Sequence, residues 1–414
     1  MAQAGSKQTL REEFVAKYGD EDWKPSSEDE WYYKFKSPND NLSTLGSVFL
    51  DPLKCYLTIG GSAKDPTYGR FDLPFSPREN ALRESKNIRC TGSRVFLDEE
   101  DRIVYDRKTD KWIWYQVWID EEASKRNGKD IDICLVHGIC DYGGKFAPHA
   151  KAFLDAGVSF VSLFPDLPSH GRSTGLHSYL TNLFVLAHAV NAVLSVVDDQ
   201  DLKSNQSQKE KILIGASLGG FTCVLHSKLY HANTGMKVPN NPSLPKVKVK
   251  GFLVLCPMLG IASDSRPSSF VELIARGIIY FAGRLALTPA NKGKNSEDPW
   301  VEQEYEADPQ CYHGYIRVAT GLAILDGLDF IEEHKDKVSS PFKILHGESD
   351  RVTRVEDSVR FYEAAKSTNK EIKLFPKTEH VMLRIGRDEE DDKKRVEVTA
   401  TMLEWVERIE KVSV

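Results

Sequence analysis

The stretch EKILIGASLGGFTCVLHSKLYHAN, residues 210–233, decides the fold. Its first residues, EKILI, are typical of a strand buried in a sheet, and the residues from Leu218 onward have the apolar spacing of a helix. Between the two stands Gly215-Ala216-Ser217-Leu218-Gly219, which matches the pentapeptide G-x-S-x-G. A strand that turns sharply into a helix is the setting in which this pentapeptide exposes a serine hydroxyl at the edge of a sheet.

The two glycines of the pentapeptide explain how such a tight turn can form. Gly215 and Gly219 carry no side chains that would collide across the turn, so the backbone can hold Ser217 in a strained conformation. Ser217 also stands at a helix N-terminus, where amide groups and the helix dipole favour developing negative charge. The pattern predicts that Ser217 is a nucleophile; the alternative is a glycine-rich turn without chemistry.

Strands and helices alternate on both sides of this turn. Three short segments rich in aromatic and β-branched residues, 93–98, 102–106 and 112–120, are predicted to form antiparallel strands. From residue 130 onward the alternation predicts a mostly parallel sheet with helices on both faces, which is the α/β class. The further predicted strands are 130–138, 158–166, 251–257, 342–347 and 371–376, and the predicted helices are 178–199, 218–233, 355–367 and 396–412.

One connection in this pattern is too long. More than 80 residues separate the predicted strands 251–257 and 342–347, whereas a crossover needs little more than a dozen. We interpret the excess as an inserted helical cap over the carboxyl edge of the sheet, where open α/β sheets bind ligands. The predicted division is an N-terminal extension of unknown role (1–92), a core (93–257 and 336–414) and a cap (258–335).

Two segments leave alternatives open. The extension carries an aromatic cluster that either packs on the body or contacts a partner or a membrane: Trp31, Tyr32, Tyr33 and Phe35. The cap segment FVELIARGIIYFAGRLAL, residues 270–287, is apolar except for one narrow stripe that recurs every fourth residue: Glu272, Arg276, Tyr280 and Arg284. Such a helix packs on the body, admits an acyl chain or lies on a membrane surface.

A serine hydroxyl needs a neighbouring base to take its proton, and that base needs an orienting acid. In α/β-hydrolases the acid and then the histidine follow later strands of the sheet. We therefore predict Asp350, in the loop after strand 342–347, as the acid, ahead of its competitors Glu348 and Asp357. His380, in the loop after the last strand, is the predicted base. Other histidines fall in a strand, in the cap or on the helix after the turn: His346, His313, His334, His226 and His231.

An oxyanion hole requires two backbone donors near the nucleophile. One is the N–H of Leu218, the residue after the serine, and the other is expected from the loop after the strand 130–138, where Ile139 is the best candidate. His137 precedes this loop; it either makes a structural hydrogen bond or contributes to the chemistry, and we favour the structural role.

Composition excludes several classes of function. The net charge of −6 does not suggest a nucleic-acid partner. The seven cysteines are an odd number without a CxxC pair, so we predict no disulfide framework, no zinc or other metal site and no cofactor. Because the N-terminus lacks an apolar signal region and no apolar run reaches about 18 residues, we expect a cytoplasmic protein, peripheral to membranes or lipid droplets at most.

From about residue 95 to the end, the chain resembles the monoacylglycerol lipase family of α/β-hydrolases. Two departures are visible: Ala216 stands where the family usually has histidine, and the first ~90 residues have no counterpart in the minimal family pattern. The resemblance implies Ser217, Asp350 and His380 as the triad, with Ile139 and Leu218 as oxyanion donors. The landmarks are HGICDYGGKF (137–146), FPDLPSHGRSTG (164–175), GASLGG (215–220), ADPQCYHGYIRVATGLAIL (307–325), HGESDRVT (346–353) and TEHVML (378–383).

These observations predict an α/β-hydrolase that cleaves carboxylic esters through an acyl-enzyme. The expected substrate is a small-molecule acyl ester, such as a monoacylglycerol, with possible peripheral membrane contact through the cap and no nucleic acid. Lysophospholipase, carboxylesterase, lactonase and acyltransferase remain as alternatives, because all use the same triad. A catalytically silent scaffold is the alternative outside enzymes. The oligomeric state is left open.

Overall fold

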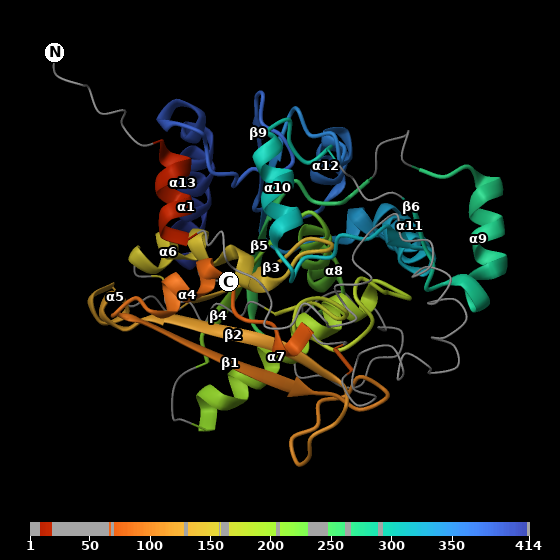
Figure 1. Ribbon diagram of the computed structural model, residues 1–414, viewed down its shortest axis with the longest axis horizontal. Helices are drawn as coiled ribbons and strands as arrows, with labels where there is room; N and C mark the ends of the chain where they lie inside the picture. The colour runs from red at the N-terminus through yellow and green to blue at the C-terminus, as the bar shows by residue number, and fades with distance from the viewer. Residues whose placement is uncertain are drawn as a thin grey trace.

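The computed structural model describes residues 9–18, 66–67, 70–127, 131–156, 158, 165–203, 208–230, 247–260, 266–288 and 293–411. Within these ranges a five-stranded parallel sheet forms the centre, in the order β3-β4-β5-β8-β9 (Figure 1). The predicted parallel sheet is therefore confirmed, whereas the predicted strand 158–166 falls mostly outside the described residues. The strands are β3 (Ile131–Val136), β4 (Glu210–Ala216), β5 (Val249–Leu255), β8 (Phe342–Gly347) and β9 (Lys370–Phe375).

Alternate residues of each strand point to opposite faces of the sheet, and an apolar cluster packs on each face. Ile133 and Leu135 belong to one apolar cluster, whereas Cys134 and Val136 belong to the other. Helices α6 (Ala147–Asp155) and α13 (Glu389–Lys411) supply the first cluster. Helices α7 (Phe184–Lys203), α8 (Leu218–Tyr230) and α12 (Val355–Ala364) supply the second.

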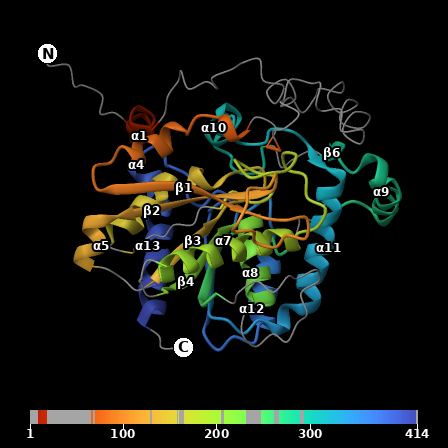
Figure 2. The same ribbon diagram turned by 90° about the horizontal axis from the view of Figure 1, so that it is seen from below.

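A separate antiparallel hairpin precedes the sheet. Strand β1 (Ile88–Phe96) pairs along its whole length with β2 (Trp112–Asp120) (Figure 2). The predicted strand 102–106 is wrong: this segment makes one isolated bridge, Leu97 to Ile103. Asp98 accepts hydrogen bonds from the N–H groups of Glu100 and Arg102, and the resulting turn takes the backbone out of extended geometry.

The hairpin also crosses the predicted boundary of the extension, since β1 begins at Ile88. Before it lie α1 (Leu10–Tyr18), a short 3-10 turn (Arg70–Asp72) and α4 (Pro77–Arg83), and after it lies α5 (Glu121–Asn127). Ser76 and Glu79 form a complete capping box at the start of α4, which fixes where that helix begins. The predicted aromatic cluster at residues 31–35 lies outside the described residues.

Two predicted helix starts differ from those observed. Helix α7 begins at Phe184 rather than at residue 178, because Thr320 bonds the carbonyl of Ser178 and the N–H of Leu180, holding this segment as a loop. Helix α13 begins at Glu389, seven residues before the predicted start. Its first turn contains four acidic residues, which suit the positive end of a helix.

The predicted cap contains three helices among its described residues. They are α9 (Ser269–Ala282), α10 (Pro299–Ala307) and α11 (Val318–His334), with a short antiparallel pair, β6 (Ala286–Thr288) and β7 (Ile316–Arg317), between them. The predicted helix 270–287 thus ends five residues early. Short 3-10 turns at Gly143–Phe146 and Lys335–Lys337 complete the elements.

Helix α9 is attached to the molecule along one side. Ala275 and Ile279 pack against α11, and Arg276 pairs with Asp326 of that helix. Figures 1 and 2 both show α9 at the edge of the molecule, away from the sheet. Its other side is apolar and exposed: Phe270, Val271, Leu273, Ile274 and Ile278. In the described parts of the chain, none of the helices has the length and apolar character required to cross a bilayer.

Candidate active site

Ser217 lies at the junction of β4 and α8, as the pentapeptide predicts. Its φ angle is 53°, a left-handed conformation that is uncommon for a residue with a side chain. The flanking glycines are necessary in the observed turn. A Cβ at Gly215 would lie 2.3 Å from the carbonyl oxygen of Gly219, and one at Gly219 would lie 2.1 Å from that of Val136. A residue with a side chain at either glycine would therefore displace the backbone that holds the strained serine.

The backbone around Ser217 is fixed from three directions. Its N–H donates to Leu255 at 3.0 Å, and its carbonyl accepts from Phe221 and Met258, each at 3.0 Å. These bonds tie the serine to the end of β5 and to the first turn of α8. The residue remains partly exposed, as a nucleophile must be.

The predicted oxyanion donors lie beside this turn. A Cβ built on Gly138 would be 3.6 Å from the Cβ of Ser217, so the loop after β3 passes directly over the serine. Gly138 and Ile139 are both partly exposed there. Leu218 is the first residue of α8, and the first N–H groups of a helix have no acceptor within the helix. The structure thus places Gly138 beside the serine and Leu218 at the start of α8, whereas the role of the Ile139 and Leu218 N–H groups as oxyanion donors stays a prediction.

The structure brings Asp350 and His380 together. Asp350 follows β8 and His380 follows β9, and Nδ1 of the imidazole lies 2.7 Å from Oδ2 of the carboxylate. The Asp350 side chain is fully buried, whereas the His380 side chain is 10% exposed. The acid is therefore shielded from water while its imidazole reaches the surface.

Asp350 is held as an anion by several donors. Its Oδ1 accepts from the N–H groups of Val352 (2.7 Å) and Thr353 (3.0 Å), and Oδ2 accepts from the Thr353 hydroxyl (2.8 Å). Burial alone would raise the pKa of Asp350, but the hydrogen bonds from His346, His380 and Val352 outweigh it and hold that pKa well below its usual range. A permanent negative charge therefore faces the imidazole.

Ser217 and the Asp350–His380 pair both lie next to the residues at the end of β5. Ser217 bonds Leu255 and Met258, and the thiol of the intervening Cys256 lies within 4.8 Å of side-chain atoms of the pair. Within the described residues the Ser217 hydroxyl makes no hydrogen bond, so the structure forms the acid–base contact and leaves the base–nucleophile contact open. Catalytic hydrogen bonds are often long without substrate.

Three more residues lie beside the site, and two of them, Cys256 and Thr353, were not singled out from the sequence. Cys256 adopts a positive φ of 41° behind the acid–base pair, and Thr353 donates to Asp350. His346, predicted as structural, is buried and bonds Ser358, and its Nε2 also lies 3.2 Å from Asp350. The threonine stands three residues after the acid, a spacing typical of a loop that closes on its own side chain.

The competing acids are placed differently. The side chain of Glu348 is exposed, and Asp357 lies in the first turn of α12, where it pairs with Arg360. His137 is structural, as favoured from the sequence: it is fully buried, its Nε2 accepts from Leu167 and its Nδ1 bonds the carbonyl of Gly138. Burial lowers the pKa of His137 to about 4, so its ring is neutral.

The other histidines bond elsewhere. His226 bonds Asn191, His313 bonds Tyr305, and His334 bonds Phe330. His231 lies outside the described residues. None of these bonds involves the candidate triad.

The donor set beside the triad is poorly suited to a metal ion. Cys256, Asp350 and His380 have potential ligand atoms within 4.8 Å of one another. However, the imidazole and carboxylate already share a hydrogen bond of 2.7 Å. Burial, together with the nearby Asp350, raises the pKa of the Cys256 thiol well above its usual value, and a thiolate is the form that binds metals.

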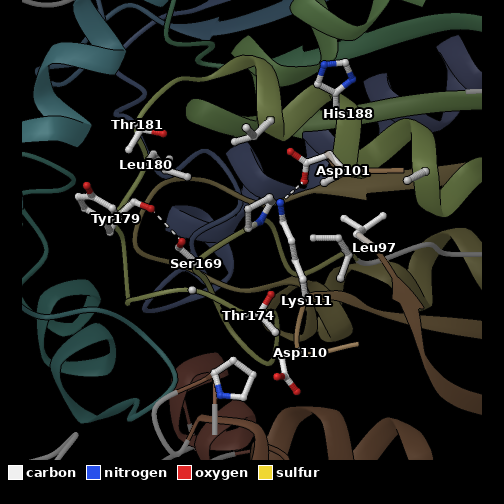
Figure 3. A pocket seen from close by; sticks show the side chains of 17 residues that line it. Leu97, Asp101, Asp110, Lys111, Ser169, Thr174, Tyr179, Leu180, Thr181 and His188 are labelled. Atoms are coloured by element: carbon white, nitrogen blue, oxygen red, sulfur yellow. Dashed lines mark hydrogen bonds and ion pairs between the residues drawn. The ribbon is translucent and has the colours of Figure 1, made fainter. Parts of the chain in front are cut away.

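The described residues form two hollows, one apart from the candidate triad and one beside it. A cavity of about 540 Å³ lies between the β1–β2 hairpin, the loop 168–181 and α7 (Figure 3). In Figure 3 the Lys111–Asp101 ion pair lies on one side of it and Tyr179 on the other. Its lining includes no residue of the candidate triad. A second, open groove of about 720 Å³ lies between the start of α10 and the loops of Asp350 and His380.

Known proteins are similar to this chain in sequence and in fold. Residues 129–384 match the family described as serine aminopeptidase S33. Caffeoylshikimate esterase of Arabidopsis thaliana is 28% identical over 245 residues, covering 58% of this chain and 67% of the relative. Monoglyceride lipase of Homo sapiens is 23% identical over 250 residues, covering 60% and 75%.

Solved structures agree on the fold. A soluble variant of monoglyceride lipase from Saccharomyces cerevisiae has a TM-score of 0.58 at 16% identity, covering 75% of this chain and 96% of that one. Monoacylglycerol lipase of Paleococcus ferrophilus has a TM-score of 0.53 at 19% identity, covering 78% and 99%. Since the family match spans more than half of the chain, this protein belongs to the serine aminopeptidase S33 family of hydrolases, has the α/β-hydrolase fold and resembles monoacylglycerol lipases.

Proposed function

We propose that this protein hydrolyses carboxylic esters, with Ser217 as nucleophile, His380 as general base and Asp350 as the orienting acid. The observation that carries the proposal is the 2.7 Å contact between His380 and the buried Asp350, at the sheet edge where the strained Ser217 also lies. A carboxylate bonded to Nδ1 leaves Nε2 of the imidazole to accept the serine proton.

The reaction then follows from the positions of the groups. Ser217 Oγ attacks the ester carbonyl while His380 takes its proton, and the N–H groups of Leu218 and Ile139 receive the negative charge on the carbonyl oxygen. His380 returns the proton to the departing alcohol, which leaves an acyl-serine ester. The same imidazole takes a proton from water, which attacks this ester; the bond between the acyl carbon and Ser217 Oγ breaks, Oγ regains the proton from His380, and the carboxylic acid is released. The charge of Asp350 stabilises the imidazolium in both steps.

We propose an ester with a medium or long acyl chain, such as a monoacylglycerol, as the substrate. The name of one relative, a monoglyceride lipase, supports this choice, whereas that of the other, a caffeoylshikimate esterase, supports ester hydrolysis alone. The exposed apolar side of α9, in the segment 258–335 that we assign to the cap, also suits an acyl chain. Lysophospholipids, lactones and short esters, or transfer of the acyl group to another alcohol, are the alternatives that a substrate panel separates.

We further propose that α9 brings the protein to lipid surfaces. Phe270 is 70% exposed and Leu273 is 67% exposed on the same helix. Burying such side chains in a bilayer interface is favourable. Phe270→Asp/Leu273→Asp is expected to reduce co-sedimentation with phosphatidylcholine–phosphatidylserine vesicles, whereas Val396→Asp, at a 55% exposed apolar position on α13, is expected to leave it unchanged. Equal recovery of all three proteins in the supernatant would refute this proposal.

The ester panel tests the proposed activity. It contains p-nitrophenyl butyrate, p-nitrophenyl laurate, a monoacylglycerol and a lysophosphatidylcholine, and each is assayed with wild type and Ser217→Ala. We expect turnover of the monoacylglycerol and a loss of at least about 10⁴-fold in Ser217→Ala. Turnover of the butyrate alone would make the protein a short-chain carboxylesterase. A folded wild type that hydrolyses no ester would support the non-catalytic scaffold instead.

A further inference from the structure

The residues just before α10 make hydrogen bonds on both sides of His380 with the loop that carries it. Three successive residues of the cap, 296–298, make the contacts. Ser296 and Glu297 bond Glu379, the residue before the histidine, and Asp298 bonds Arg384, four residues after it. We call residues 296–298 the clasp. The imidazole loop is thus held on both flanks by a segment outside the sheet.

Glu379 makes the tighter of the two contacts. Its Oε2 accepts from the Ser296 hydroxyl at 2.6 Å, and its Oε1 accepts from the N–H of Glu297 at 2.7 Å. Arg351, in the loop of the acid, adds an ion pair at 3.3 Å. The Glu379 side chain is 20% exposed, so these charge-assisted bonds are mostly shielded from water.

The backbone of Glu379 is fixed on its opposite side. A Cβ on Gly347, the last residue of β8, would lie 2.3 Å from the carbonyl oxygen of Thr378 and 2.8 Å from that of Glu379. Ser349 donates to the same Thr378 carbonyl at 2.9 Å. The backbone at Glu379 therefore contacts the loop of the acid, and its side chain contacts the clasp. His380 is the next residue along the chain.

The other flank continues the same network. Asp298 caps α10 by accepting from Trp300, and its carboxylate lies 3.0 Å from Arg384. Arg384 also pairs with Asp391 of α13 at 2.7 Å. Arg11 of α1 forms an ion pair with Asp298 as well. The clasp is consequently anchored to the body.

We propose that Glu379 is a positioning residue, through which the clasp holds His380 in register with Ser217. The cap is then part of the catalytic apparatus as well as a cover for substrate. This inference rests on the proposed function, because it requires His380 to be the base. An imidazole loop released from the clasp would drift by a fraction of an ångström, and misplacement of about 1 Å costs on the order of 10²-fold in rate.

The rate at which a small fluorophosphonate labels Ser217 tests this directly, because the probe carries no long acyl chain that would have to bind elsewhere. We expect Glu379→Ala to label about tenfold more slowly and Ser296→Ala about threefold more slowly. The double variant should label close to the rate of Glu379→Ala, because both changes break the Ser296–Glu379 hydrogen bond; the Ser296 hydroxyl also accepts from the N–H of Asp298, a bond within the clasp. Glu379→Gln should label within about threefold of wild type, because its amide can accept from Glu297 and donate to Ser296.

Glu348→Gln is the matched control. Glu348 lines the same groove beside the acid, but its exposed carboxylate makes no hydrogen bond or ion pair among the described residues, so labelling should be unchanged. With p-nitrophenyl butyrate, Glu379→Ala should lower kcat and leave KM near the wild-type value. A purely structural role would change the melting temperature without this split or the rescue by glutamine.

Several outcomes would overturn the inference. One is labelling of Glu379→Ala at the wild-type rate. Another is a double variant whose labelling rate falls by the product of the two single-variant factors, because the two changes would then act independently. If Glu379→Ala does not fold, Ser296→Ala decides, and its labelling at the wild-type rate rejects the clasp. A wild type that is not labelled at all refutes the proposed function itself, whereas a labelled wild type with an equally labelled Glu379→Ala refutes the clasp alone.

Discussion

Adding one methyl group at Gly219 should disable the site without disturbing the rest of the fold. The new Cβ would lie 2.1 Å from the carbonyl oxygen of Val136 and 2.6 Å from that of His137. Since contacts under 3.0 Å essentially do not occur, the end of β3 and the turn must separate by about 1 Å. That movement shifts Gly138 and Ile139, which follow directly, away from Ser217. A displacement of about 1 Å at reacting groups costs on the order of 10²-fold in rate.

Fluorophosphonate labelling and hydrolysis of p-nitrophenyl butyrate measure this loss, with circular dichroism to confirm folding. Gly321→Ala is the matched control, because its Cβ would meet nothing within 4 Å on α11. The same methyl group should leave the rate unchanged there and stabilise the protein by about 1 kcal/mol, the usual difference between glycine and alanine in a helix. A folded Gly219→Ala that labels at the wild-type rate would contradict the proposed placement of the oxyanion donors.

Two further predictions concern charge. Thr353→Val removes the 2.8 Å hydrogen bond to Asp350. Because a hydrogen bond to a charged group contributes about 1.5–3 kcal/mol, this change should lower kcat about tenfold. Thr353→Ser keeps the hydroxyl and should retain most activity. Acid should destabilise the fold: burial lowers the pKa of His137 to about 4 and of His170 and His226 to about 3, whereas the unfolded chain protonates these rings below about 6.5. Above about pH 6.5 these rings are neutral in both states; below it the unfolded chain gains protons that the folded chain excludes, so stability falls by about 1 kcal/mol per ring between pH 7.5 and 5.5. Burial lowers the pKa of His149 to about 3 and that of His177 well below its usual value, which adds to the loss, whereas Asp166, whose pKa burial raises to about 6, partly offsets it. Urea unfolding should show a lower free energy of unfolding at pH 5.5 than at pH 7.5, and equal stability at both pH values would contradict the neutral rings.

Much of the site follows from order along the chain. Ser217, Asp350 and His380 each lie at or in the loop after a strand of a parallel sheet, and the carboxyl ends of such strands share one edge. The structure places each at that edge and joins the last two. The roles of the three in catalysis, and of Ile139 and Leu218 as donors, remain predictions.

Residues that act through loop packing could not be found in this way. Cys256 lies beside the acid–base pair because the chain leaves β5 with a positive φ, and no local pattern marks that. Glu379 meets Ser296 across 83 positions of sequence, so their contact depends on how the cap folds back. Single-sequence patterns describe neighbours within a turn or a strand, and these contacts join separate loops.

Helix α9 shows the same limit for an amphipathic pattern. Glu272 and Arg276 of its polar stripe bond each other, and Arg276 reaches Asp326 on α11. Glu272 and Arg276 therefore lie toward a neighbouring helix, whereas much of the described apolar surface of α9 faces outward, the reverse of an ordinary surface helix. Packing on the body, one of the three interpretations that the sequence allows, accounts for one side of α9 only.

The identity of the residue that becomes covalently modified tests the account most directly. Wild type and Ser217→Ala are treated with diisopropyl fluorophosphate, and intact mass and peptide mapping locate the adduct. The account predicts one adduct per wild-type chain, on the peptide that contains Ser217, and none on Ser217→Ala. An adduct on another residue, or equal modification of both proteins, would contradict it.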